Sequence, residues 1–180
     1  MTAGTASPTA HGPGRASPWP CHHPAGSTGR YDESARRASH SELAVALLLA
    51  AEGHEVKTLP EARGVPTPDL VACGVPVEVK AFSTLGQRDG RPASARQVAN
   101  KVIDARRQGA VAVIWGPGSG LTETVARAGY SLSCRRAAEV GWGQLQAVRV
   151  VGDTFDLSFA PSREVRPVAN ASARRPRLSA

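Results

Sequence analysis

The sequence predicts an α/β fold in which a mixed β-sheet core is flanked by helices. Along residues 39–160, the spacing of apolar residues changes several times between the helical and the strand period. Residues 110–115 form a continuous apolar run rich in β-branched side chains, which is typical of a strand covered on both faces. The expected order is helix, three strands, helix, strand, helix and two strands, and this order indicates a mixed sheet.

The composition permits one domain with an aliphatic core. Hydrophobic residues make up 41% of the 180 residues and aromatic residues only 4%, so Ala, Val and Leu must fill the core. The longest apolar run, residues 43–51, is about half the roughly 18–20 residues that cross a bilayer, so we expect no membrane partner. No apolar segment of a secretory signal is visible in the first 30 residues. We expect a cytoplasmic protein, or an effector exported by a route that the sequence does not show.

Composition also divides the chain into three parts. Residues 1–38 are rich in Pro, Gly, Ser and Thr and almost lack large aliphatic side chains, which predicts a disordered leader. Residues 161–180 contain five Arg and three Pro without an apolar run, which predicts a disordered basic tail. The folded domain is expected over residues 39–160. Most of the net charge of +7 comes from the two ends, so it supports only a nonspecific attraction to polyanions.

The first helix has a clear start signal. Ser39 with Glu42 three residues later matches a capping box. The apolar run 43–51 is too dense for a surface helix and predicts a buried one, with Gly53 as its C-cap. A short strand is predicted next, at residues 56–59.

Residues 69–82 are predicted to form a hairpin with a two-residue turn at Cys73 and Gly74. Counting back from that turn places Asp69 directly opposite Glu78. The Cβ atoms of such a pair lie about 4.5 to 5.5 Å apart. Two carboxylates at this distance repel each other unless they share a proton or a cation.

The hairpin therefore predicts a divalent-metal site. A hard ion, most simply Mg²⁺ with Mn²⁺ or Zn²⁺ as alternatives, would bind Asp69 and Glu78. Lys80 projects from the same face as Glu78 and would orient or deprotonate a water molecule or stabilise negative charge. Together these groups suit phosphodiester hydrolysis. Glu42 is a candidate third metal ligand and catalytic carboxylate, or it serves only the capping box.

A second helix is predicted from Ser94 to Gln108. Gln97 and Lys101 lie one turn apart on its polar face, where they either contact substrate phosphates or form a solvent-facing pair. Arg106 and Arg107 lie near its C-terminal end, and the interpretation we favour is that they offset the helix dipole rather than contact RNA.

The last elements are a strand, a helix and a hairpin. The strand covers residues 110–115 and is followed by a Gly-rich turn and a helix over 121–128. The hairpin joins 144–151 to 154–159 around Gly152 and Asp153. Residues 130–142 match neither period and are left unassigned.

The motif resembles a known nuclease family. Asp69 after Pro68, then Glu78-Val79-Lys80, resembles the PD-(D/E)xK nuclease superfamily with its restriction-endonuclease-like fold. Over about residues 39–115 the chain is similar to the tRNA nuclease toxin domain at the C-terminus of CdiA proteins, which act in contact-dependent growth inhibition. The resemblance implies metal-dependent cleavage of nucleic acid, with Asp69, Glu78 and Lys80 as the catalytic core. It also implies tRNA as substrate and a cognate immunity protein as partner.

Three other interpretations stay open. The chain is a DNA endonuclease of the same superfamily, or a catalytically silent module that binds nucleic acid. Alternatively, Asp69 only starts a strand while Glu78 and Lys80 pair on a solvated face.

Overall fold

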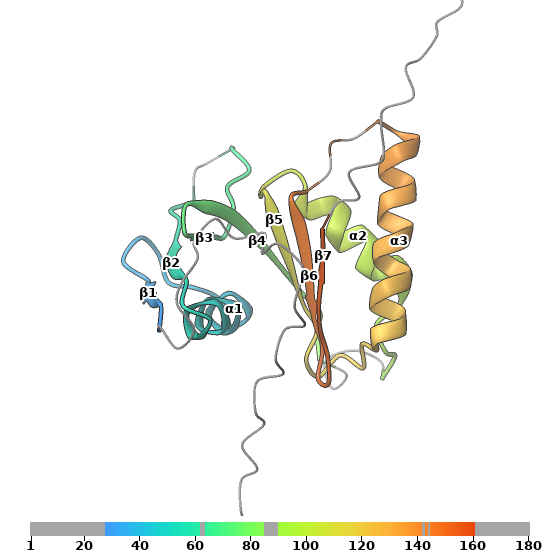
Figure 1. Cartoon of the computed structure of the whole chain (residues 1–180), viewed down its shortest axis with the longest axis horizontal. Helices are drawn as coiled ribbons and strands as arrows, with labels where there is room; N and C mark the ends of the chain where they lie inside the picture. The colour runs from blue at the N-terminus through green and yellow to red at the C-terminus, as the bar shows by residue number, and fades with distance from the viewer. Residues whose placement is uncertain (1–27, 62–63, 85–89, 142, 144, 161–180) are drawn as a thin grey trace, which may run out of the picture.

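The structure is a computed structural model that describes residues 28–61, 64–84, 90–141, 143 and 145–160. Its seven strands form one sheet in which spatial order follows chain order, β1 to β7 (Figure 1). The elements in chain order are β1 (Arg30–Asp32), α1 (His40–Ala51), β2 (Glu55–Thr58), β3 (Leu70–Ala72), β4 (Val75–Ala81), α2 (Ala95–Ala105), β5 (Val111–Trp115), α3 (Glu123–Glu139), β6 (Ala147–Val151) and β7 (Asp156–Phe159).

The sheet is mixed, as predicted. Strands β1 and β2 run parallel, and so do β4, β5 and β6. Strand β3 is antiparallel to both of its neighbours, and β7 is antiparallel to β6. Helix α1 covers one face of the sheet, and α2 and α3 cover the other (Figure 1). The prediction of an α/β fold with a mixed sheet is therefore confirmed.

Two hydrophobic cores lie on opposite faces of the interior strand β5. Val111 and Val113 pack with α1, whereas Ala112 and Ile114 pack with α2 and α3. All four side chains are fully buried. This alternation is what a strand covered on both faces requires, so the interpretation of residues 110–115 is confirmed.

The capping boxes and hairpin turns follow the sequence. Both halves of the Ser39–Glu42 box are formed at the start of α1. Cys73 and Gly74 have φ angles of 50° and 81°, the left-handed values of a two-residue hairpin turn. The second predicted hairpin is the β6–β7 pair, which turns at Gly152. Helix α1, in contrast, is not buried all round, because it packs on the sheet with one side only and Leu47 is 52% exposed.

The predicted boundary between leader and domain is wrong. Residues 28–38 belong to the described structure, and β1 within them pairs with β2. The Gly29 N–H donates to the Ala50 carbonyl at 2.7 Å, and a Cβ on Gly29 would lie 2.0 Å from the His54 carbonyl oxygen. A three-residue strand of Arg, Tyr and Asp has no apolar alternation, so its pairing with β2 could not be seen in the sequence. Residues 1–27 of the leader and the whole predicted tail lie outside the described residues.

Helix α3 is longer than predicted. It runs to Glu139 and includes most of the segment that the sequence left unassigned. Gly129 and two serines interrupt its pattern, but the glycine has a packing reason: a Cβ there would lie 2.4 Å from the Cβ of Val98 on α2. Helix α2 ends at Ala105, earlier than predicted. Among the described residues, no helix is long and apolar enough to cross a membrane.

Candidate active site

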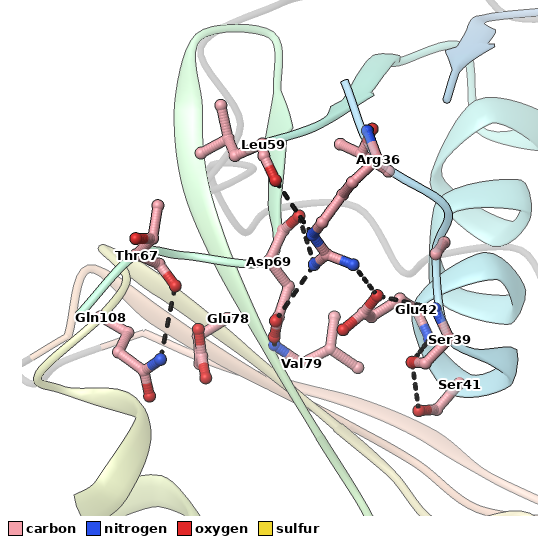
Figure 2. Close-up of polar contacts among 12 residues, drawn as sticks. Arg36, Ser39, Ser41, Glu42, Leu59, Thr67, Asp69, Glu78, Val79 and Gln108 are labelled. Atoms are coloured by element: carbon pink, nitrogen blue, oxygen red, sulfur yellow. Dashed lines mark hydrogen bonds and ion pairs between the residues drawn. The ribbon is translucent and has the colours of Figure 1, made fainter. Parts of the chain in front are cut away.

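The predicted carboxylate pair is formed at the β3–β4 hairpin (Figure 2). Leu70 pairs with Val77, so the next step of the register places Asp69 opposite Glu78. Asp69 is fixed by the backbone of β4, because the Val79 N–H donates to its Oδ2 at 2.9 Å. The sequence predicted this placement from turn length alone.

Glu78 is buried and incompletely satisfied. It is 1% exposed, and the backbone of Gly109 covers it so closely that a Cβ there would lie 2.9 Å from the Glu78 nitrogen. Lys80 Nζ forms an ion pair with Glu78 Oε1 at 2.5 Å. Glu78 Oε2 has no hydrogen-bond partner among the described residues. Burial raises the pKa of Glu78, although the ion pair with Lys80 opposes the shift.

Asp69 is a second perturbed carboxyl group. Its burial and the neighbouring charges of Glu78 and Glu42 raise its pKa to about 7, against the opposing effect of the Val79 N–H. Burial also disfavours the charge of Glu42, but hydrogen bonds from Arg36 and from the Ser39 N–H hold the pKa of Glu42 below its usual value. The hairpin and the start of α1 therefore bring three carboxyl groups with different environments together.

Arg36 is a site residue that the sequence interpretation missed. Its Nη1 donates to Glu42 Oε2 at 2.7 Å, its Nη2 to Asp69 Oδ1 at 3.4 Å, and its Nε to the Leu59 carbonyl at 2.9 Å (Figure 2). The guanidinium thus lies between two of the three predicted metal ligands. Arg36 falls in the segment that composition assigned to the leader, and two of its partners, Leu59 and Asp69, come from distant parts of the chain, so no local pattern marks it.

Gln108 is the other residue that the sequence did not single out. Lys80 Nζ donates to Gln108 Oε1 at 3.1 Å, and Gln108 Nε2 donates to the Thr67 carbonyl at 3.3 Å. A cavity of about 240 Å³ beside the cluster is lined by Arg36, Thr67, Asp69 and Gln108, among others. Gln108 therefore lines this cavity and also contacts Lys80, which pairs with Glu78.

The predicted residues of α2 lie differently. Gln97 completes a capping box, since its Oε1 accepts hydrogen bonds from the Ser94 N–H at 2.9 Å and from the Ser94 hydroxyl at 3.1 Å. Lys101 places its ammonium group 4.8 Å from the centre of the Phe82 ring. The structure therefore brings Glu42, Asp69, Glu78 and Lys80 together, and the substrate contacts of Gln97 and Lys101 stay predictions.

The donor set suits a hard divalent ion. Among the described residues, no group of three or more acidic, His or Cys side chains is arranged to hold one metal ion. Because Arg36 holds Glu42, the carboxylates left for an ion are those of Asp69 and Glu78. Mg²⁺ commonly binds one or two carboxylates together with water and substrate phosphate. The unpartnered Glu78 Oε2 is the kind of oxygen that such an ion would satisfy.

Comparisons with known proteins give one likeness. No protein-family model matches the chain, and no curated protein matches it. One solved structure, described as a CdiA-CT/CdiI toxin and immunity complex from Burkholderia pseudomallei, is similar at 21% sequence identity and a TM-score of 0.42. The match covers 67% of this chain and 82% of the other. A likeness of this size does not assign the chain to a family.

Proposed function

We propose that the chain is a metal-dependent endonuclease of the PD-(D/E)xK type that hydrolyses phosphodiester bonds of RNA, with tRNA as the expected substrate. The observation that carries the proposal is the buried Glu78, whose Oε2 has no partner among the described residues, with the partly buried Asp69 and Lys80 beside it. A buried polar atom without a partner costs about 1–3 kcal/mol, and a divalent ion bound to Glu78 Oε2 would offset that cost.

Asp69 and Glu78 would hold the divalent ion. When bound, such an ion polarises the scissile phosphate and lowers the pKa of the attacking water. Glu42 is a candidate ligand only where Arg36 releases it, because the guanidinium now occupies the space between Glu42 and Asp69. The Val79 N–H keeps Asp69 turned toward Glu78.

Lys80 would act on the phosphate. Glu78 and Gln108 hold its Nζ on either side, and Gln108 is itself anchored on the Thr67 carbonyl. A fixed ammonium group beside the reacting atoms stabilises the negative charge that develops during phosphodiester cleavage. It also orients a water molecule by hydrogen bonding.

The test is cleavage of three substrates: bulk tRNA, single-stranded DNA and duplex DNA, each with Mg²⁺ and with EDTA. The native chain is expected to cut tRNA with Mg²⁺ only. Asp69→Asn and Glu78→Gln are expected to lose at least 100-fold in rate, on the order of the loss of one major stabilising group in an active site. Glu139→Gln, at an exposed carboxylate at the end of α3, is the matched control and keeps full activity.

Each other outcome assigns a different function. Cutting only DNA would keep the mechanism and correct the substrate to that of a DNA endonuclease. Salt-sensitive binding without cleavage in any metal would show a silent binding module. Full cleavage by both Asp69→Asn and Glu78→Gln would contradict the proposed site. A cognate immunity protein stays a prediction from the sequence resemblance and is tested by toxicity of the chain when expressed alone.

A further inference from the structure

A larger cavity adjoins the carboxylate cluster. It measures about 480 Å³ and lies where the end of α2 meets the starts of β5 and β6. Gly109 lines it and also touches the backbone of Glu78, while the preceding residue, Gln108, contacts Lys80 (Figure 2 shows Gln108 beside Glu78). One residue of the cavity lining, Gly109, therefore lies directly against Glu78 of the proposed catalytic groups.

The lining of this cavity is cationic. It contains the guanidinium groups of Arg106 and Arg107, and none of the described residues that line it carries a carboxylate. Arg107 is exposed and forms no ion pair within the part of the chain that the structure describes. One positive side chain is thus available to an anion from solvent.

Arg106 is partly buried and incompletely satisfied. Its Nη1 donates to the Gly143 carbonyl at 2.9 Å, but its buried Nε has no hydrogen-bond partner among the described residues. Burial also lowers the pKa of the Arg106 guanidinium, and a nearby anion would offset that desolvation. A cation at a helix C-terminus is stabilised by the helix dipole, but by about 0.3–1 kcal/mol, and this does not account for a buried N–H without a partner.

We propose that this cavity binds a phosphodiester group of the substrate strand, adjacent to the bond that is cut, through Arg106 and Arg107. Guanidinium groups match phosphate oxygens with paired hydrogen bonds, and the other described lining residues are uncharged. The two guanidinium charges outweigh the partial negative charge, about half a unit, at the C-terminal end of α2. The nature of the strand rests on the proposed nuclease function, whereas the recognition of phosphate rests on the cavity itself.

The test measures binding without catalysis. Labelled tRNA is titrated with the chain in EDTA at several salt concentrations, so that no divalent ion supports cleavage. Arg107→Gln is the main variant because its exposed side chain leaves the fold intact, and the double variant Arg106→Gln with Arg107→Gln is checked by thermal unfolding. Arg96→Gln is the control, since it removes the same charge from an exposed position on α2, about 15 Å along the helix from Arg106.

Arg107→Gln is expected to weaken tRNA binding about tenfold, as for loss of one charged hydrogen bond, and to do so more than Arg96→Gln. It should also reduce the slope of log K against log salt by about 0.7–0.9, which corresponds to one phosphate contact. Equal affinity and slope for Arg107→Gln and Arg96→Gln would overturn the proposal, and so would a native chain that does not bind tRNA. If Arg107→Gln weakens tRNA binding as expected but the native chain does not cleave tRNA in Mg²⁺, the nuclease function is contradicted and the phosphate site is kept.

Discussion

Two arginine-centred clusters lie at opposite ends of α1. Each has an excess of negative charge, and they differ in how far solvent reaches the carboxylates that carry it. At the C-terminal end, Arg149 binds Glu52 and Asp156 with hydrogen bonds from Nε, Nη1 and Nη2. Although burial opposes it, the two carboxylates raise the pKa of Arg149. Their side chains are 27% and 34% exposed, so water solvates the charge that Arg149 leaves unbalanced.

At the N-terminal end, Arg36 and Lys80 face three carboxyl groups. Here the excess charge is inside the protein: Glu78 is 1% exposed, with one unpartnered oxygen. Asp69 has a pKa raised to about 7. Both clusters contain one more acid than base, but the acids of the N-terminal cluster are less exposed, and Asp69 there takes up a proton below its raised pKa. The difference separates a structural ion network from the site at which we propose that a divalent cation binds.

A large loss of stability is expected at the structural cluster. Arg149→Gln leaves Glu52 and Asp156 without their shared cation and should lower the free energy of unfolding by about 3 kcal/mol. This value is at the lower end of the range for a broken buried pair, because both carboxylates are partly exposed. Urea denaturation measures it, with Arg135→Gln at an exposed position of α3 as control. Equal stability of the two variants would mean that the Arg149 network contributes nothing.

A smaller loss is expected for Arg36→Gln. Removing the guanidinium deprives Glu42 and Asp69 of a partly buried counter-charge, which should cost about 2 kcal/mol in EDTA. A divalent ion can replace that charge, so Mg²⁺ should restore more stability to Arg36→Gln than to the native chain. The thermal midpoints of both proteins with and without Mg²⁺ measure this. If Mg²⁺ raises the thermal midpoint of Arg36→Gln and of the native chain equally, the ion does not replace the charge of Arg36.

A third expected effect is a pH dependence of stability. Because the pKa of Asp69 is raised on folding to about 7, the native state holds a proton that the unfolded chain has lost. Stability from this group is therefore present below the unfolded pKa of about 4 and is lost as pH rises toward 7. Relative to native, Asp69→Asn should become progressively more stable between pH 4 and 7. A constant difference in thermal midpoint across that range would contradict the raised pKa.

The sequence was informative where local rules act. The two-residue turn at Cys73 and Gly74 fixes the hairpin register, and the register in turn fixes Asp69 opposite Glu78. The capping pattern at Ser39 marks the start of α1 for the same reason.

Tertiary contacts explain what the sequence did not predict. Arg36 joins the site through Leu59 and Asp69, which are more than 20 residues away in the chain. The length of α3 was underestimated because a glycine such as Gly129 usually weakens a helix. In the fold, Gly129 lies inside α3 where Val98 of α2 leaves no room for a Cβ atom. Glu42 accepts hydrogen bonds both from Ser39 in the capping box and from Arg36 in the carboxylate cluster. The local sequence pattern predicts only the first of these contacts.

Binding of Mg²⁺ measured by isothermal titration calorimetry tests the central claim most directly, because the N-terminal cluster is held to lack one cation. The native chain is expected to bind one ion, and Glu78→Gln and Asp69→Asn are expected to bind none. Asp156→Asn, in the structural cluster, should bind as the native chain does. Mg²⁺ binding of the same affinity and stoichiometry by Glu78→Gln, Asp69→Asn and the native chain would contradict the assignment of the metal site.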